Sequence, residues 1–117
     1  MSLYKYGKFE IEIDQTDVAF VEKYESAAEA YEKEMNAVRK DGKASEIFSA
    51  MCNVFFDMFD RIFGEGTHKL MFGEKRSVDA CANALGQLVS VMNDYTGTLN
   101  NISSITPANR AQRRTKK

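Results

Sequence analysis

Residues 46–63 read EIFSAMCNVFFDMFDRIF and hold five of the eight phenylalanines of the chain. At the helical period, one set of apolar residues shares a face: Ile47, Met51, Val54, Phe55, Met58 and Ile62. A second set extends the apolar surface most of the way round: Phe48, Cys52, Phe56, Phe59 and Phe63. A helix that is apolar on nearly every side lies either at the centre of a core or partly exposed for a partner. We therefore predict a helix over residues 45–63, ended by Gly64 and Gly66.

Two further helices are predicted on either side of it, each with an apolar row spaced alternately by three and four residues. The first covers residues 17–40, with Asp14 or Thr16 as its N-cap, and its row is Val21, Tyr24, Ala28, Tyr31, Met35 and Val38. The second covers residues 77–103, with Ser77 as its N-cap, and its row is Val78, Cys81, Leu85, Leu88, Met92 and Tyr95, extended by Leu99 and Ile102. The sequence thus predicts a mainly α fold built as a three-helix domain.

The N-terminal segment has a different period. Residues 4–13 read YKYGKFEIEI, in which Phe9, Ile11 and Ile13 alternate with charged residues, as is typical of a half-buried strand. Gly7 is placed to turn residues 3–6 back onto this strand, so a short N-terminal β segment or hairpin is expected. Because a two-stranded ribbon alone is marginally stable, it is expected to lie on the helices. A short helical turn is expected at residues 67–72.

Charge divides the chain into a body and a basic C-terminal tail. The first 108 residues hold 11 of the 16 basic residues and all 17 acidic ones, a net charge of −6. The last nine residues, NRAQRRTKK, carry a charge of +5 from Arg110, Arg113, Arg114, Lys116 and Lys117. The only proline, Pro107, lies between the two. We therefore predict one helical domain over residues 1–106 and a tail over residues 107–117.

Catalytic and metal chemistry have little support in this sequence. Cys52 and Cys81 lack the CxxC spacing and are expected to be buried thiols. With His68 as the only histidine, the roughly four ligands that zinc needs at characteristic spacings are absent. Asp57 and Asp60 are interpreted as solvated polar positions rather than a catalytic carboxylate pair. No enzyme activity, metal or other cofactor is therefore expected.

The expected cellular location follows from two kinds of segment that are not seen in this sequence. No run approaches the roughly 18 apolar residues of a membrane helix. The first residues carry charges too early and too often for a signal peptide. The sequence therefore predicts a cytosolic protein that does not bind membranes.

The candidate binding site is the aromatic and methionine-rich helix. An ordinary core explains it most simply, and a partner-binding or self-association face is the alternative. The candidate residues for such a face are Phe48, Met51, Phe56, Phe59 and Phe63. Because Phe56, Phe59 and Phe63 lie off the main apolar row, we expect them to be less buried than Val54, Phe55 and Met58.

Three interpretations of the basic tail remain open. A terminus of this composition is often disordered. Its Lys and Arg residues suit phosphate contacts, which makes a small nucleic-acid-binding regulator the main rival function. The acidic body opposes the approach of a polyanion, so nucleic acid is the less favoured partner. Electrostatic docking onto an acidic surface, such as that of a neighbouring copy, is the third interpretation.

A resemblance to a known family rests on three short segments. The leader FEIEID, the start DVAFVEKYE of the first helix and the tip NRAQRRTKK resemble the small tail assembly chaperones of long-tailed bacteriophages. The middle of the chain is similar only in its helical character. The resemblance implies a non-enzymatic helical protein that is encoded just ahead of the tape measure protein. In the cytoplasm of the bacterial host, many copies of it would coat this long apolar client and leave before the tail is finished. It fixes no binding residue, so the candidate site rests on the aromatic helix.

Overall fold

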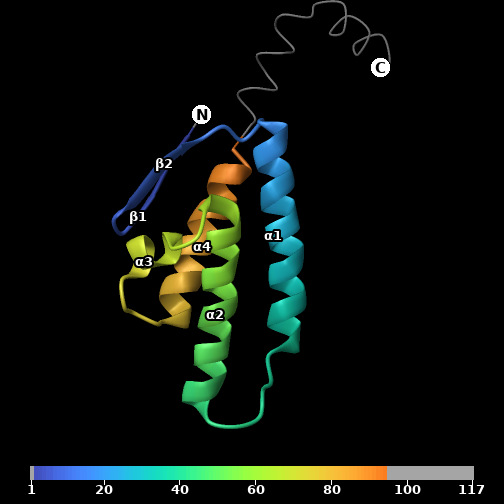
Figure 1. Cartoon of the computed structure of the whole chain (residues 1–117), viewed down its shortest axis with the longest axis vertical. Helices are drawn as coiled ribbons and strands as arrows, with labels where there is room; N and C mark the ends of the chain where they lie inside the picture. The colour runs from blue at the N-terminus through green and yellow to red at the C-terminus, as the bar shows by residue number, and fades with distance from the viewer. Residues whose placement is uncertain (1, 95–117) are drawn as a thin grey trace, which may run out of the picture.

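The computed structural model describes residues 2–94 and is mainly helical (Figure 1). Two strands come first, β1 (Ser2–Tyr6) and β2 (Phe9–Ile13). Four helices follow in the order α1 (Val18–Ala37), α2 (Ala44–Phe63), α3 (Thr67–Phe72) and α4 (Val78–Met92). The predicted mainly α fold with an N-terminal hairpin is confirmed, and α3 is the short helical turn expected at residues 67–72. The basic tail, residues 107–117, lies outside the described residues.

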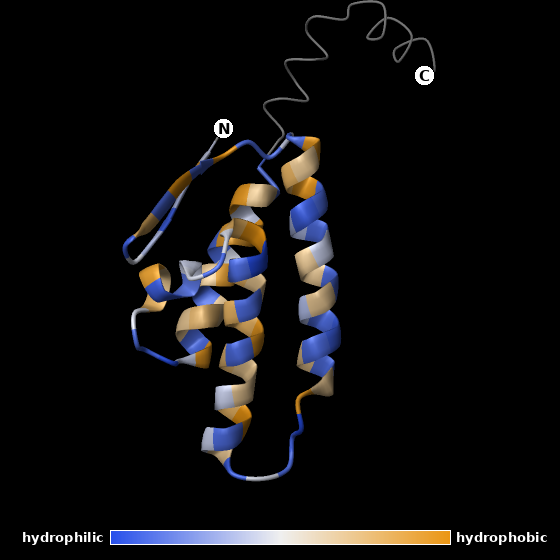
Figure 2. Cartoon of the chain, viewed as in Figure 1, coloured by the Kyte–Doolittle hydropathy of each residue, from blue (hydrophilic) through white to orange (hydrophobic). Residues whose placement is uncertain are grey.

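Helix α2 is the central element of this arrangement. It runs antiparallel to α1 on one side and contacts α3 and α4 on the other. It also supplies about half of the buried apolar side chains, namely Cys52, Val54, Phe55, Phe56, Met58, Phe59 and Ile62. Among α1 residues only Ala27 is fully buried, and the predicted apolar row of α1 is half-buried. In Figure 2 the hydrophilic residues of α1 lie mainly on the side away from α2.

Helix α1 differs from the prediction at both ends. Its N-cap is Asp17, whose carboxylate accepts a hydrogen bond from the Phe20 amide at 3.0 Å. Asp14 instead accepts bonds from the Thr16 amide and hydroxyl, at 3.0 and 2.6 Å, which forms a local turn before the helix. The helix ends at Ala37 rather than near residue 40, because Val38 takes an extended conformation.

Helix α4 begins as predicted, with the Ser77 hydroxyl accepting a hydrogen bond from the Ala80 amide at 3.2 Å. It ends at Met92, and the prediction of a continuous helix to residue 103 is wrong. The Gln15 side-chain amide donates to the carbonyls of Val91 (2.9 Å) and Asp94 (3.1 Å). A side chain from the connection between β2 and α1 thus satisfies carbonyl groups at the end of α4. Residues 95–103 lie outside the described part of the chain.

The hairpin is held on the helices by specific contacts. Tyr6 pairs with Phe9 across a two-residue turn in which Gly7 has φ +60°. The buried Tyr4 hydroxyl donates to the Ala84 carbonyl of α4 at 2.8 Å. The Lys8 amide donates to the Leu70 carbonyl of α3 at 2.9 Å. The hairpin therefore covers one side of the helical layer, as the prediction required.

Candidate functional site

Two of the candidate partner-binding residues belong to the core. Phe59 is 0% exposed, so the expectation that it is less buried than Val54, Phe55 and Met58 is wrong. Phe56, at 7% exposed, is buried as well, although slightly less than Phe55 and Met58. The reason is α3, which folds over this side of α2 and places the Phe72 ring 5.8 Å from Phe59 and 5.6 Å from Phe56. Off-row aromatic residues are thus covered by an element too short to show a helical period in the sequence.

Phe63 is half-buried at the other end of α2, and the expectation that it is less buried than Val54, Phe55 and Met58 is confirmed. Its ring stacks on Tyr4 of β1 at 5.8 Å and lies 4.9 Å from Phe9 of β2 and 6.0 Å from Phe20 of α1. Three elements converge on this side chain, which therefore joins the hairpin to the two long helices. These ring contacts explain Phe63 as a residue that packs the core rather than one that binds a partner.

The N-terminal half of α2 differs from the rest of the helix. Phe48 is 53% exposed, and Ile47, Ala50 and Met51 are half-buried. This part of α2 projects beyond α3 and the start of α4, toward the bottom of Figure 1. We refer to these four residues as the open end of α2. Of the candidate residues on the aromatic helix, Phe48 and Met51 are the two that the structure places together on an accessible surface.

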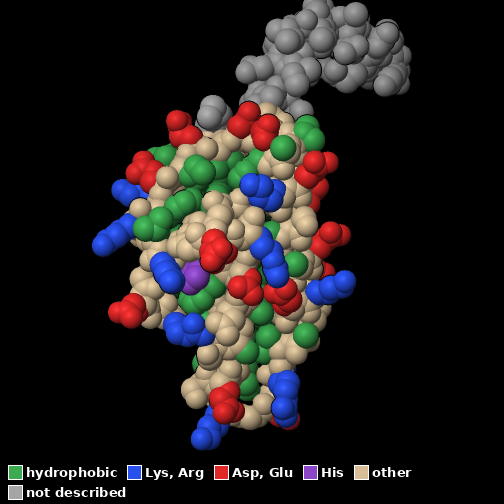
Figure 3. Space-filling view, in the orientation of Figure 1, with side chains coloured by type: hydrophobic (Ala, Val, Ile, Leu, Met, Phe, Trp, Pro, Cys, Tyr) green, Lys and Arg blue, Asp and Glu red, His purple; other side chains and the backbone are tan. Residues whose placement is uncertain are grey.

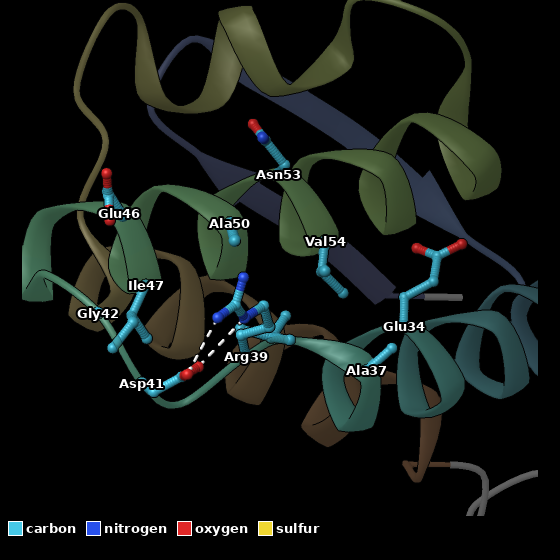
Figure 4. A pocket seen from close by; sticks show the side chains of 11 residues that line it. Glu34, Ala37, Arg39, Asp41, Gly42, Glu46, Ile47, Ala50, Asn53 and Val54 are labelled. Carbon is cyan, nitrogen blue, oxygen red and sulfur yellow. Dashed lines mark hydrogen bonds and ion pairs between the residues drawn. The ribbon is translucent and has the colours of Figure 1, made fainter.

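A cleft of about 510 Å³ lies beside the open end, where α1, the connection after it and α2 meet (Figure 4). Apolar side chains line much of it: Ala37, Val38, Ile47, Ala50 and Val54. Its volume falls in the range of sites that hold small molecules or inserted side chains. Phe48 does not line this cleft; together with the start of α4 it lines a smaller hollow of about 350 Å³.

Three of the four charged residues that line the cleft form ion pairs, and the fourth, Glu46, accepts a backbone hydrogen bond at the start of α2. Arg39 donates to both carboxylate oxygens of Asp41, at 3.1 and 3.0 Å, as the dashed lines in Figure 4 show. This contact raises the pKa of Arg39 and lowers the pKa of Asp41. Arg61 pairs with Glu34 at 2.7 Å. Because these charges already have partners, the unsatisfied part of the cleft is its apolar wall.

Reactive groups are scarce in the described part of the chain. Over residues 2–94, no group of three or more His, Cys, Asp or Glu side chains is placed to hold a metal ion. Cys52 and Cys81 are free and fully buried. Burial, with a smaller effect of the neighbouring Cys52, raises the pKa of the Cys81 thiol to about 12. A thiol that stays protonated at neutral pH is a poor nucleophile.

The interpretation of Asp60 as a solvated position is wrong, whereas Asp57 is exposed. The half-buried Asp60 carboxylate accepts a hydrogen bond from the His68 amide at 3.1 Å and lies 2.9 Å from the His68 ring nitrogen Nδ1. The His68 ring stacks on Phe56 at 4.5 Å. No spacing rule in the sequence joins these residues, because the Gly64–Gly66 turn brings them together.

The predicted electrostatic residues of the tail, from Arg110 to Lys117, lie outside the described residues. Among helices of the described part, none is long and apolar enough to cross a membrane. No curated protein and no solved structure shows significant similarity to the chain. A family model, however, matches residues 7–117, nearly the whole sequence. The chain therefore belongs to a family of unknown function (DUF6673).

Proposed function

We propose that this chain is a non-enzymatic tail assembly chaperone that binds the tape measure protein of a long-tailed bacteriophage, as a homo-oligomer, in the cytoplasm of the host. The observation that carries the proposal is the open end of α2, where Phe48 is 53% exposed and where Ile47 and Ala50 line an apolar cleft on another face of the helix. The resemblance of the leader, the first helix and the tip to such chaperones supplies the identity of the client.

The open end suits an apolar helical client. Amphipathic helices bind in apolar grooves through side chains spaced at i, i+3 and i+4. The cleft offers space for one such anchor, and the exposed Phe48 offers apolar contact at the smaller hollow. Phe56 and Phe59 support this surface from within the core and do not contact the client in this proposal.

Weak binding at each site fits a client that must later be released. Fully burying a phenylalanine side chain is worth about 1.5–3 kcal/mol, so covering the exposed half of Phe48 contributes roughly 1 kcal/mol. One site of this strength does not hold a long apolar chain. Several copies acting together gain affinity without any new contact, because each additional binding event becomes intramolecular. Self-association is therefore part of the proposed function.

Coexpression with the tape measure protein encoded beside it tests the proposal. The wild-type chain is expected to keep the client in the soluble fraction, and the Phe48→Ser variant is expected to lose most of this effect. Leu3→Ser is the matched control, because Leu3 of β1 is 54% exposed and lies far from the open end. Equal client solubility with wild type and Phe48→Ser would contradict the proposal.

The rival function, a nucleic-acid-binding regulator, rests on the basic tail alone. Binding through phosphate contacts weakens steeply with salt, by orders of magnitude when many phosphates are contacted. Capture of an apolar helix changes little over the same range. A salt titration of each complex therefore distinguishes a regulator from a chaperone.

A further inference from the structure

A second hollow, of about 530 Å³, lies on the side of α2 away from α1. The Phe56 ring forms part of its lining, with the His68 ring stacked at 4.5 Å and the Arg76 guanidinium 5.5 Å from the ring centre. The client site proposed above does not use it. Because the two rings are stacked and the guanidinium lies over one of them, the hollow is a preformed surface rather than a gap between loops.

Arg76 is fixed in place at this hollow. Its Nη2 atom donates to the Ser49 carbonyl at 3.0 Å, to the Ser49 hydroxyl at 2.8 Å and to the Asn53 side-chain oxygen at 3.0 Å. All three acceptors are neutral, so the positive charge of Arg76 is not neutralised by them. A held guanidinium presents its remaining donors in a fixed orientation, which favours carboxylate partners.

The lining of the hollow is basic overall. Lys69 and Lys75 are exposed and form no ion pair with any residue of the described range 2–94. Together with Arg76 they face one carboxylate in the lining, Glu74. Figure 3 shows Lys and Arg side chains around the single His on this side of the molecule. We refer to Lys69, Lys75 and Arg76 as the basic hollow.

The opposite side of the molecule carries the complementary charge. Glu22, Glu25, Glu29 and Glu32 are spaced by three, four and three residues along α1, so they share one face of the helix. All four are exposed, and none forms an ion pair with a residue between 2 and 94. Acidic side chains along the α1 edge are visible in Figure 3. We refer to these four residues as the acidic face.

We propose that copies of this chain associate head to tail, with the acidic face of one copy seated on the basic hollow of the next. One chain cannot join these surfaces internally, because α1 and α3 lie on opposite sides of α2 (Figure 1). Contact between two different surfaces leaves one of each free at the ends, so it repeats into a ring or an open filament. The inference rests on the self-association part of the proposed function and names the surfaces responsible.

The ion pairs of this contact are exposed, so the association is sensitive to salt. The screening length falls from about 10 Å at 0.1 M to about 3 Å at 1 M ionic strength. We expect the association constant to fall at least tenfold between about 50 mM and about 500 mM salt. A contact made mainly by apolar side chains would not weaken in this way.

A charge-swap experiment with the full-length chain tests the proposal. Lys69→Glu/Lys75→Glu changes the basic hollow from three positive charges to two negative and one positive. Glu25→Lys/Glu29→Lys/Glu32→Lys changes the acidic face from four negative charges to three positive and one negative, and all five positions are exposed. Sedimentation velocity at low salt is expected to show assemblies for wild type and monomers for each variant alone. An equimolar mixture of the two variants is expected to regain assembly, since each reversed surface then meets an opposite one. Circular dichroism verifies that each variant is folded.

The control for the hollow variant is Lys8→Glu/Lys40→Glu, which lowers the net charge by the same four units at exposed positions outside both surfaces; it is expected to assemble like wild type. A wild-type chain that stays monomeric at low salt, or a mixture that does not recover, overturns the proposal. If the hollow variant assembles normally and assembly is lost only when residues 109–117 are deleted, the basic surface that binds the acidic face is the tail and not the hollow. Because no client is present, these outcomes are independent of the Phe48→Ser test.

Discussion

Phe48 and Phe59 show how position along a helix can outweigh position around it. They are 11 residues apart, about three helical turns, and so point in nearly the same direction from α2. Phe59 is nevertheless 0% exposed and Phe48 is 53% exposed. Periodicity predicts the direction in which a side chain points, but it does not predict where the neighbouring elements end. Two residues of the open end, Phe48 and Met51, are therefore among the candidate residues, but sequence alone does not separate them from the core residues Phe56 and Phe59.

Truncating these two residues should give very different losses of stability. Phe59→Ala leaves a cavity among buried side chains and is expected to lower the free energy of unfolding by about 3–5 kcal/mol. Phe48→Ala removes a side chain that is already half in water, so the expected loss is below about 1 kcal/mol. Urea unfolding of both variants measures the difference. Similar losses would show that the open end of α2 is covered in the isolated chain.

At the scale of elements, the sequence predicted the starts of α1, α2 and α4 to within one residue and the end of α2 at Phe63, but not the ends of α1 and α4. Ser77 follows a local rule, because a hydroxyl one residue before an apolar period caps the first turn. The end of α4 depends on Gln15, which lies 76 residues from Val91 in the chain. The order of the hairpin and helices could be predicted because it depends on local patterns. The covering of Phe56 by α3 could not, because it depends on tertiary contacts.

The turn of the hairpin offers a sharp test of its docking on α3. A Cβ atom at Gly7 would overlap the Met71 carbonyl, and φ of +60° is itself unfavourable for alanine. Gly7→Ala is expected to cost about 1–3 kcal/mol of unfolding free energy. Gly86→Ala is the control, because that helical glycine has no atom near its Cβ position and should gain up to about 1 kcal/mol. Thermal unfolding of both variants measures the difference. If Gly7→Ala proved neutral, the hairpin would not be docked on α3 as described.

At the scale of the whole molecule, the net charge of −1 hides three separated regions. The acidic face lies on α1, the basic hollow lies across α2 from it, and the last nine residues add +5. The acidic spacing on α1 can be seen in the sequence. The basic hollow cannot, since Glu74 lies between Lys69 and Lys75 in the sequence and only the fold selects which side chains line the hollow. Charge separation of this kind favours ordered contact between copies over non-specific aggregation.

Deleting residues 109–117 tests how much the charge of the tail contributes to contact between copies. The body alone has a charge of −6 rather than −1, so copies repel one another more strongly. The truncated chain is expected to keep its circular dichroism spectrum while forming smaller oligomers and smaller client complexes at low salt. Above roughly 0.5 M salt, where screening acts over only a few ångströms, the two chains should behave alike. Sedimentation velocity across a salt series measures this convergence, and identical assembly of both chains at low salt would show that the tail does not mediate contact between copies or with the client.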